Sequence, residues 1–215
     1  MTISTQPGNW VAKLQRFVRE PAAPPMERCE LCSAAIAEDH SHLAEPASRR
    51  LLCACRACAT LLGNRESGRY RLVPERTLML RDFRLSDAEW DAFGIPIGLA
   101  FFFHSTAEDH IVAFYPGPAG PMESLLQLGA WSQLLGRNPV LAELEPDVEA
   151  LLVNRVNGSR DYYRVPIDRC YALVGLIRTH WQGMSGGADA WKAIDGFFAG
   201  LPREQQAGPG ACRHG

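Results

Sequence analysis

The sequence predicts an α+β fold, in which a small cysteine-rich module precedes an antiparallel domain built from hairpins and helices. Two observations carry this prediction. Five of the seven cysteines lie within thirty residues near the amino end. Beyond them, strand-like runs follow one another as hairpins, and the helical patterns do not alternate with strands as a parallel sheet requires. With 215 residues, of which 47% are apolar, the chain is large enough to bury a core of ordinary size.

Changes in composition divide the chain into four segments. We expect an N-terminal helix and linker over residues 1–27, with the helical pattern in residues 10–19. The cysteine module is predicted over residues 28–84, and the α+β domain over residues 85–202. Residues 203–215 are expected to form a disordered tail.

The second half of the cysteine module contains two alternating segments on either side of a Pro-Glu turn. They predict a hairpin of Arg69–Val73 with Thr77–Phe83. A short helix is predicted directly after it, because Ser86 and Glu89 have the spacing of a capping box. Gly94 fits the position that follows the end of this helix.

Two aromatic runs in the α+β domain, Ile97–His104 and Ile111–Tyr115, predict a second hairpin. The Pro and Gly residues of segment 116–121 are then expected to interrupt the chain. A stripe of apolar side chains at helical spacing predicts a helix over Met122–Leu135.

A third hairpin is predicted where residues 148–156 and 161–165 flank Asn157-Gly158, a dipeptide typical of hairpin turns. Asp168 is expected to cap the helix that follows. A last helix is predicted after the glycine-rich break at residues 183–187.

The formal net charge of −2 conceals a strong segregation of charge along the chain. Residues 49–84 contain nine arginines and three acidic residues, whereas residues 85–149 contain ten acidic residues and one arginine. Either the two segments attract each other within the fold, or the basic segment forms a patch for a partner.

Two CxxC pairs, Cys29 with Cys32 and Cys55 with Cys58, are separated by 22 residues. A CxxC pair places two thiolates about one turn apart, so a second pair at this spacing completes a tetrahedral site. The pattern predicts a four-cysteine metal centre of the zinc-ribbon or rubredoxin-like type. In so small a module, the metal is expected to drive folding.

Three further side chains are candidate ligands, and the pattern leaves their roles open. Cys53 is surplus to a four-cysteine site, so it either replaces Cys55, supplies a spare thiolate or stays free. His40 and His42 lie between the two pairs. A site of three thiolates and one imidazole therefore competes with the interpretation that both are solvated loop histidines.

Zinc is predicted as the metal and iron is the alternative, because both accept four thiolates. Rubredoxin-like knuckles usually have Gly after the second Cys, where this chain has Ser33 and Ala59, and this difference favours zinc. Arginines around the second pair are expected to offset the negative charge of the thiolates, namely Arg49, Arg50 and Arg56.

Motifs for catalysis are missing from the rest of the sequence. It contains no phosphate-binding loop, nucleophile elbow or HExxH motif. His104, His110 and His180 are each expected to be structural. Cys170 lies on the apolar stripe of a predicted helix and is expected in the core. We therefore expect a protein that is not an enzyme.

The expected location is the cytoplasm, without a membrane span. The longest apolar run, Ile95–Phe103, is about half the length of a spanning helix. Residues 1–10 lack the features of an export signal, so the cysteines are expected to stay reduced and bind metal. Nucleic acid is a disfavoured partner, because the acidic segment would repel phosphate.

Six short motifs are distinctive in combination: Cys-Glu-Leu-Cys, His-Ser-His-Leu, Leu-Leu-Cys-Ala-Cys-Arg-Ala-Cys, Gly-Leu-Ala-Phe-Phe-Phe, Ala-Phe-Tyr-Pro and Arg-Thr-His-Trp. Through them, roughly residues 10–200 resemble an uncharacterised bacterial family of cysteine-rich proteins encoded alongside nickel-iron hydrogenase and maturation genes. The resemblance implies an accessory role in hydrogenase assembly, with a hydrogenase subunit or maturation factor as the protein partner. It also implies Cys29, Cys32, Cys55 and Cys58 as ligands, with Cys53, His40 and His42 as candidates.

Overall fold

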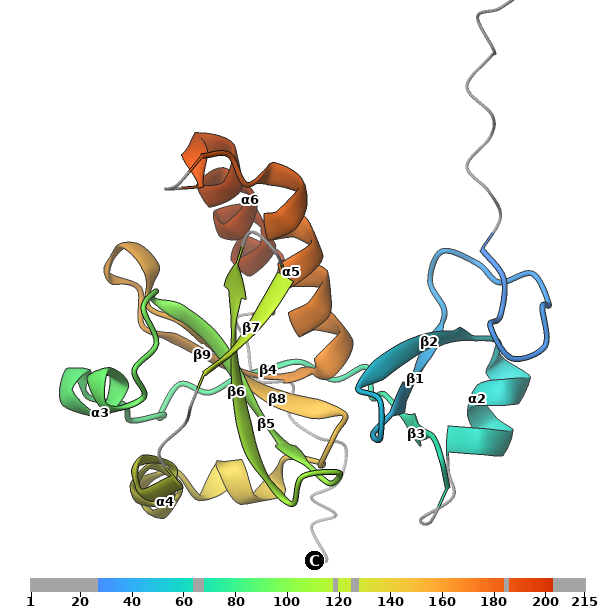
Figure 1. Cartoon of the computed structure of the whole chain (residues 1–215), viewed down its shortest axis with the longest axis horizontal. Helices are drawn as coiled ribbons and strands as arrows, with labels where there is room; N and C mark the ends of the chain where they lie inside the picture. The colour runs from blue at the N-terminus through green and yellow to red at the C-terminus, as the bar shows by residue number, and fades with distance from the viewer. Residues whose placement is uncertain (1–26, 64–67, 118–119, 125–127, 184–185, 203–215) are drawn as a thin grey trace, which may run out of the picture.

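Two antiparallel β-sheets organise the chain in the computed structural model, which describes residues 27–63, 68–117, 120–124, 128–183 and 186–202 (Figure 1). The small sheet has the strand order β2-β1-β3, and the large sheet has the order β4-β9-β8-β5-β6-β7. Helices pack on both, so the predicted α+β class is confirmed. The helix predicted in residues 10–19 and the tail predicted at 203–215 lie outside the described residues.

The elements are labelled as in Figure 1. The small-sheet strands are β1 (Ser41–Glu45), β2 (Arg50–Ala54) and β3 (Arg71–Leu72). The large-sheet strands are β4 (Leu78–Met79), β5 (Leu99–Ser105), β6 (His110–Gly117), β7 (Gly120–Ser124), β8 (Glu149–Asn154) and β9 (Asp161–Pro166). The helices are α2 (Arg56–Gly63), α3 (Asp87–Ala92), α4 (Leu128–Arg137), α5 (Ile167–His180) and α6 (Gly187–Ala199). Within the described part of the chain, no helix combines the length and the apolar character that crossing a membrane requires.

A hairpin of β1 and β2, covered by helix α2, forms the centre of the small sheet. Its register pairs Leu43 with Leu52 and His42 with Cys53. Among the described residues, its cluster of buried apolar side chains consists of Leu43, Leu52, Ala54 and Ala59, with partly buried side chains packed against it. Ala44 and Val73 pack into the core of the large sheet, so the small sheet has few buried side chains of its own.

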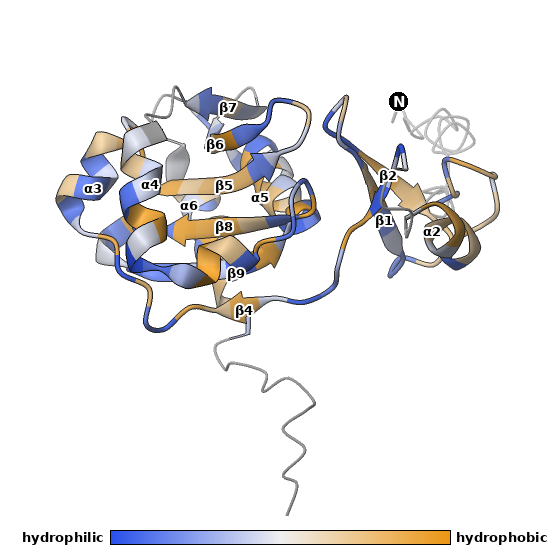
Figure 2. Ribbon diagram, turned by 90° about the horizontal axis from the view of Figure 1, so that it is seen from below, coloured by the Kyte–Doolittle hydropathy of each residue, from blue (hydrophilic) through white to orange (hydrophobic). Residues whose placement is uncertain are grey.

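The large sheet has a core on each face. Strand β5 is buried almost throughout, as a continuous apolar run requires of a central strand. Phe101 and Phe103 pack in a cluster with side chains of helices α5 and α6, whereas Phe102 packs in another with side chains of α3 and α4. The hydropathy colouring of β5, β8 and β9 shows these apolar strands between the helices (Figure 2). The result is a layer of sheet between two layers of helix.

The hairpin predicted for Arg69–Val73 and Thr77–Phe83 is wrong. Both segments contain a short strand, but β3 pairs with β1 of the small sheet and β4 pairs with β9 of the large sheet. Each strand has two residues, too few for a stable hairpin of their own. The Pro74-Glu75 segment therefore connects the two sheets.

The predicted short helix and the predicted aromatic hairpin are both confirmed, as α3 and as β5 with β6. The Ser86 hydroxyl accepts a hydrogen bond from the Glu89 backbone N–H, and the Glu89 carboxylate accepts one from the Ser86 N–H, so the capping box starts α3 as predicted. Gly94 follows the helix with a φ of +64°, a left-handed conformation that favours glycine. The aromatic hairpin is present as β5 and β6.

The interruption predicted at 116–121 is instead part of a hairpin, because β6 continues to Gly117 and pairs with β7. Pro116 and Pro121 face each other in this pair. Both are tolerated because β7 is an edge strand, and because β5 pairs with β6 only up to Phe114. The helix predicted from Met122 consequently starts later, at α4.

The third hairpin is confirmed as β8 and β9, which pair from Glu149 with Pro166 to Asn154 with Asp161. Asn157 lies at the tip of the turn with a φ of +53°. The prediction for Asp168 is wrong, because α5 starts with Pro166 at its N-cap and makes no side-chain capping bond. The Asp168 carboxylate accepts a hydrogen bond from the small sheet instead.

Ion pairs hold the basic segment against the acidic one. Arg49 pairs with Glu108 and, at 3.0 Å, with Glu123. Arg71 pairs with Asp147 at 3.3 Å. These contacts join the small sheet to the strands and loops of the large sheet. The segregation of charge in the sequence therefore reflects attraction within the fold.

A buried carboxylate, Glu149, anchors the start of β8. Its side chain is fully buried and accepts hydrogen bonds from Arg76 at 2.6 Å and from Arg164 Nε at 2.9 Å. Burial alone would raise the pKa of Glu149, but the two arginines lower it below its usual range. The Arg164 side chain is itself buried, so the pair satisfies two charges at once.

Replacing Glu149 by Ala is expected to lower the free energy of unfolding by about 3–5 kcal/mol, because Arg164 is then left buried without its main partner. Urea denaturation at neutral pH measures this loss. The matched control is Glu145→Ala, which removes an exposed partner of Arg76 and is expected to cost less than about 1 kcal/mol.

The stability that Glu149 supplies is also expected to depend on pH. Because its pKa is lower in the folded chain, this stability is present above the unfolded value of about 4.3 and is lost as the pH falls through the folded value. The difference between wild type and Glu149→Ala should therefore shrink in acid. A difference that grows as the pH falls would contradict this assignment.

Candidate metal centre

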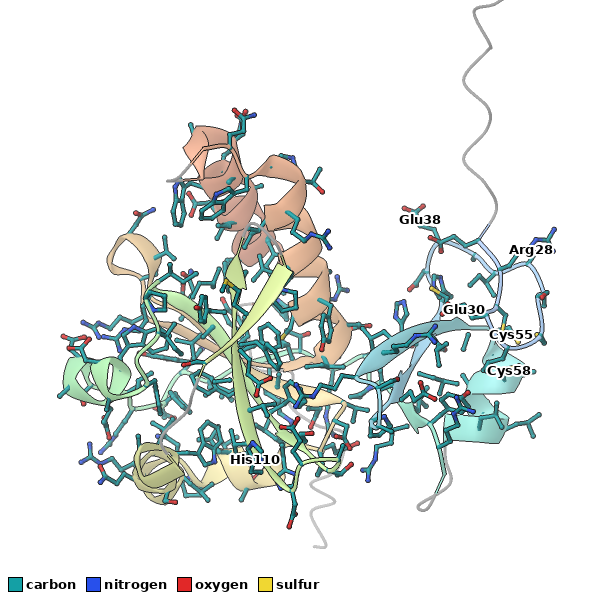
Figure 3. The ribbon with its side chains drawn as sticks, in the orientation of Figure 1. Arg28, Glu30, Glu38, Cys55, Cys58 and His110 are labelled. Atoms are coloured by element: carbon teal, nitrogen blue, oxygen red, sulfur yellow. The ribbon has the colours of Figure 1, made fainter. Side chains whose placement is uncertain are left out.

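The structure brings together the four cysteines of the two CxxC pairs. Cys29 and Cys32 lie in the loop before β1, Cys55 follows the end of β2, and Cys58 lies in the first turn of α2. Their four sulfur atoms all lie within 4.8 Å of one another. Cys55 and Cys58 are seen together at the start of α2, next to the loop that contains Glu30 (Figure 3).

The first pair is held in a tight loop by backbone hydrogen bonds. The Ser33 N–H donates to the Cys29 carbonyl at 2.8 Å, and the Cys29 N–H donates to the Ala34 carbonyl at 2.8 Å. Ser33 adopts a φ of +62°, in the left-handed region that favours glycine. The sequence therefore places serine at a backbone position that glycine would adopt without strain.

The distances fit a tetrahedral ion and exclude a disulfide. The sulfur atoms of Cys32 and Cys55 are 3.7 Å apart. A tetrahedron of metal–sulfur bonds of about 2.3 Å has edges of about 3.8 Å. A disulfide would require about 2.05 Å, and all four cysteines are free thiols.

The electrostatics of the four sulfurs favour a bound cation. Although burial opposes ionisation of Cys29, backbone N–H donors, that of Cys55 foremost, lower its pKa to about 6. The pKa of Cys58 is raised to about 12 by the sulfurs of Cys32 and Cys55 beside it. One thiol of the group thus ionises readily while another resists. A divalent cation would allow all four to ionise together.

None of the described contacts joins Arg49, Arg50 or Arg56 to a sulfur of the group, so the expected charge balance by arginines stays a prediction. Arg49 is occupied elsewhere, since it forms ion pairs with the acidic segment and its guanidinium lies over the Phe114 ring at 5.5 Å. Arg50 lies 3.9 Å from Glu30, an acidic residue inside the first CxxC pair. Arg56 is exposed in the second pair. Arg49 therefore joins the two sheets and is not one of the arginines that could balance the charge of the thiolates.

The three additional candidates form a group of their own. One ring nitrogen each of His40 and His42 and the sulfur of Cys53 lie within 4.8 Å of one another. His42 Nδ1 lies 3.0 Å from a carboxylate oxygen of Asp168. This contact raises the pKa of His42. Sequence reasoning missed this role of Asp168, because Asp168 lies 126 residues further along the chain than His42.

The remaining candidates lie away from both groups. Cys170 is completely buried in the large-sheet core, as predicted. His104 is the second-to-last residue of β5, and the His180 ring donates from Nδ1 to the Leu176 carbonyl at 2.9 Å. His110 lies at the far end of the β5–β6 hairpin (Figure 3). Among the described residues, none of these four belongs to a group of potential metal ligands.

Comparison with known proteins gives one match. Residues 28–205 match a family model described as "Family of unknown function (DUF5947)", which covers both sheets. No curated protein and no solved structure matches the chain.

The left-handed conformation of Ser33 restricts which side chains the first CxxC loop accepts. Replacing Ser33 by Val is expected to cost about 1–3 kcal/mol, because a β-branched side chain is strained at this positive φ. Ser33→Gly is the control and should be tolerated, since the Ser33 side chain is exposed. Thermal unfolding of the metal-loaded protein measures both. Equal stability of the two variants would contradict the left-handed conformation.

Proposed function

The chain belongs to the DUF5947 family of unknown function, and we propose that it is a non-enzymatic, metal-binding accessory protein whose four-cysteine centre holds zinc. The observation that carries this proposal is the convergence of four sulfur atoms within 4.8 Å. Four thiolates fill a tetrahedral coordination sphere, so the metal keeps no open position for a substrate. Such a closed centre stabilises a fold.

The size of the small-sheet core supports a structural role for the metal. Its four buried apolar side chains supply little of the energy that folding requires. A structural zinc ion supplies on the order of 10 kcal/mol or more. With the ion bound, the β1–β2 hairpin would present a rigid surface to a protein partner.

The main alternative is a rubredoxin-like iron centre that transfers electrons. The exposure of Cys32 favours it, because an electron-transfer centre needs an edge near the surface. Serine and alanine after the second cysteine of each pair favour zinc. Binding of nucleic acid has less support, because Arg49, Arg71 and Arg76 already pair with acidic residues.

The proposed biological setting is the assembly of a nickel-iron hydrogenase in the cytoplasm. It is supported by the resemblance of the motifs to proteins encoded with hydrogenase and maturation genes. Free cysteines in every described position agree with a reducing compartment. A hydrogenase subunit or maturation factor is the proposed partner.

Protein purified without oxygen is expected to be colourless and to contain zinc, and Cys32→Ser should lower the zinc content by one equivalent per chain. Cys32 is exposed, so its replacement changes little packing. Cys170→Ala is the matched control, because it removes a thiol from the large-sheet core and should leave the metal in place. Elemental analysis measures both.

Two results would contradict the zinc centre. A red sample that is bleached reversibly by a reductant would identify iron and favour electron transfer. Full retention of metal in Cys32→Ser would show that the four sulfurs do not act as one site.

Affinity purification of the tagged chain from its native host tests the partner. We expect a hydrogenase subunit or maturation factor to copurify with wild type, and its yield to fall at least several-fold with Cys32→Ser, because the metal-free module loses its rigid surface. The tagged Cys170→Ala chain serves as the control. Copurification of unrelated proteins alone would contradict the proposed setting.

A further inference from the structure

A second group of metal-binding side chains lies on the β1–β2 hairpin. His42 of β1 is directly opposite Cys53 of β2, so their side chains share one face of the sheet. His40 is two residues before His42, and its ring lies 4.8 Å from the His42 ring, measured between centroids. The three potential ligand atoms lie within 4.8 Å of one another and form a group separate from the four cysteines.

Both imidazoles are held in the orientation that metal-binding histidines adopt. His40 Nδ1 lies 2.8 Å from the Ala37 carbonyl, and His42 Nδ1 lies 3.0 Å from the Asp168 carboxylate. Because each of these oxygens accepts a hydrogen bond, Nδ1 carries the proton and Nε2 carries the lone pair. A hydrogen bond from the other ring nitrogen to a carbonyl or carboxylate is the usual support of a histidine ligand.

His40 provides an independent sign that a ligand is missing. Its side chain is 8% exposed, and its Nε2 atom is buried without a hydrogen-bond partner. A buried polar atom left unpaired is costly in a folded protein. A metal ion bonded to this nitrogen would remove the cost.

The surroundings of His40 and His42 are acidic and open, so they would attract a cation and let it exchange with the solvent. Both line an open groove of about 460 Å³ between the small sheet and helix α5. Four acidic residues line the same groove against one arginine, namely Glu38, Asp39, Glu75, Asp168 and Arg169. Its negative charge would raise the local concentration of a divalent cation.

We propose that His40, His42 and Cys53 bind a second divalent transition-metal ion, at a site distinct from the four-cysteine centre. Two imidazoles and one thiolate select ions of the zinc, cobalt and nickel type over magnesium or calcium. Three protein ligands leave a fourth coordination position open, which suits an ion that is exchanged with a partner or a small ligand. This site does not depend on the function proposed for the first.

Asp168 is the positioning residue of this site. It comes from the first turn of α5 and orients His42 without being a ligand itself. Removing such a supporting carboxylate typically lowers metal affinity about 10–100-fold. The second site therefore draws on both sheets, whereas the four-cysteine centre is built from the small sheet and its flanking loop and helix alone.

The test is a titration of the metal-free full chain with Co²⁺ under anaerobic, reducing conditions, followed by its visible and near-ultraviolet absorption. We expect saturation at two equivalents for wild type. Cys53→Ser and His40→Ala should each saturate at one equivalent and keep the strong thiolate absorption of the four-cysteine centre. His110→Ala is the matched control and should retain two equivalents, because His110 is exposed and far from the group.

Two further variants separate this proposal from the preceding one. Cys32→Ser should lose the equivalent bound by four thiolates and keep the one that depends on Cys53. Asp168→Asn should weaken the second equivalent about 10–100-fold and leave the affinity of the first unchanged. If Cys32→Ser does not fold, Cys53→Ser, His40→Ala and Asp168→Asn still decide the question, because the four-cysteine centre is intact in them.

The proposal is overturned if wild type saturates at one equivalent, or if a second equivalent survives both Cys53→Ser and His40→Ala. Retention of both equivalents in Cys32→Ser would contradict only the interpretation of the first centre.

Discussion

Four cysteine thiols converge beside the small sheet, and repulsion among their thiolates opposes the ionisation of all four in the absence of a cation. Cys29 has a pKa of about 6, whereas the neighbouring sulfurs raise the pKa of Cys58 to about 12, so the thiols resist ionising together. The apolar core of this sheet has four buried side chains and cannot dominate the energetics. A cation bound by the four sulfurs would therefore add stability to this module. The large sheet has no such dependence, because β5 and β8 are covered on both faces.

One hairpin organises both groups of potential ligands. Cys53 lies opposite His42 in the sheet, and two residues later the chain has left β2, so Cys55 belongs to the other group. Glu30, which lies between Cys29 and Cys32, connects the four-cysteine group to the group of Cys53 through two hydrogen bonds. Its N–H donates to the Cys53 carbonyl at 2.9 Å, and its carboxylate accepts from the Cys53 N–H at 2.8 Å. The groups differ in closure: four thiolates complete a tetrahedron, whereas two imidazoles and one thiolate leave a position open.

Sequence predicted the features whose causes are local. The CxxC spacing predicted that the four cysteines come together, and the capping box of Ser86 and Glu89 predicted the start of α3. Asn157-Gly158 predicted the turn between β8 and β9. It failed where the partner is distant. Strands β3 and β4 look like a hairpin because their true partners, β1 and β9, are not visible in the local pattern. By sequence, Asp168 looks like the cap of helix α5. In the structure its carboxylate instead bonds to His42 in strand β1 of the small sheet.

The contact between the two sheets combines apolar packing with ion pairs between the basic and acidic segments. Ala44 of β1 and Val73, which directly follows β3, pack into the core of the large sheet. Around them, Arg49 and Arg71 pair with acidic residues, so the charges of the basic segment are used within the fold. The His42–Asp168 hydrogen bond lies in the same contact region, at the start of α5. His42 thus takes part in the contact between the small sheet and α5, and the group that it forms with His40 and Cys53 lies beside that contact.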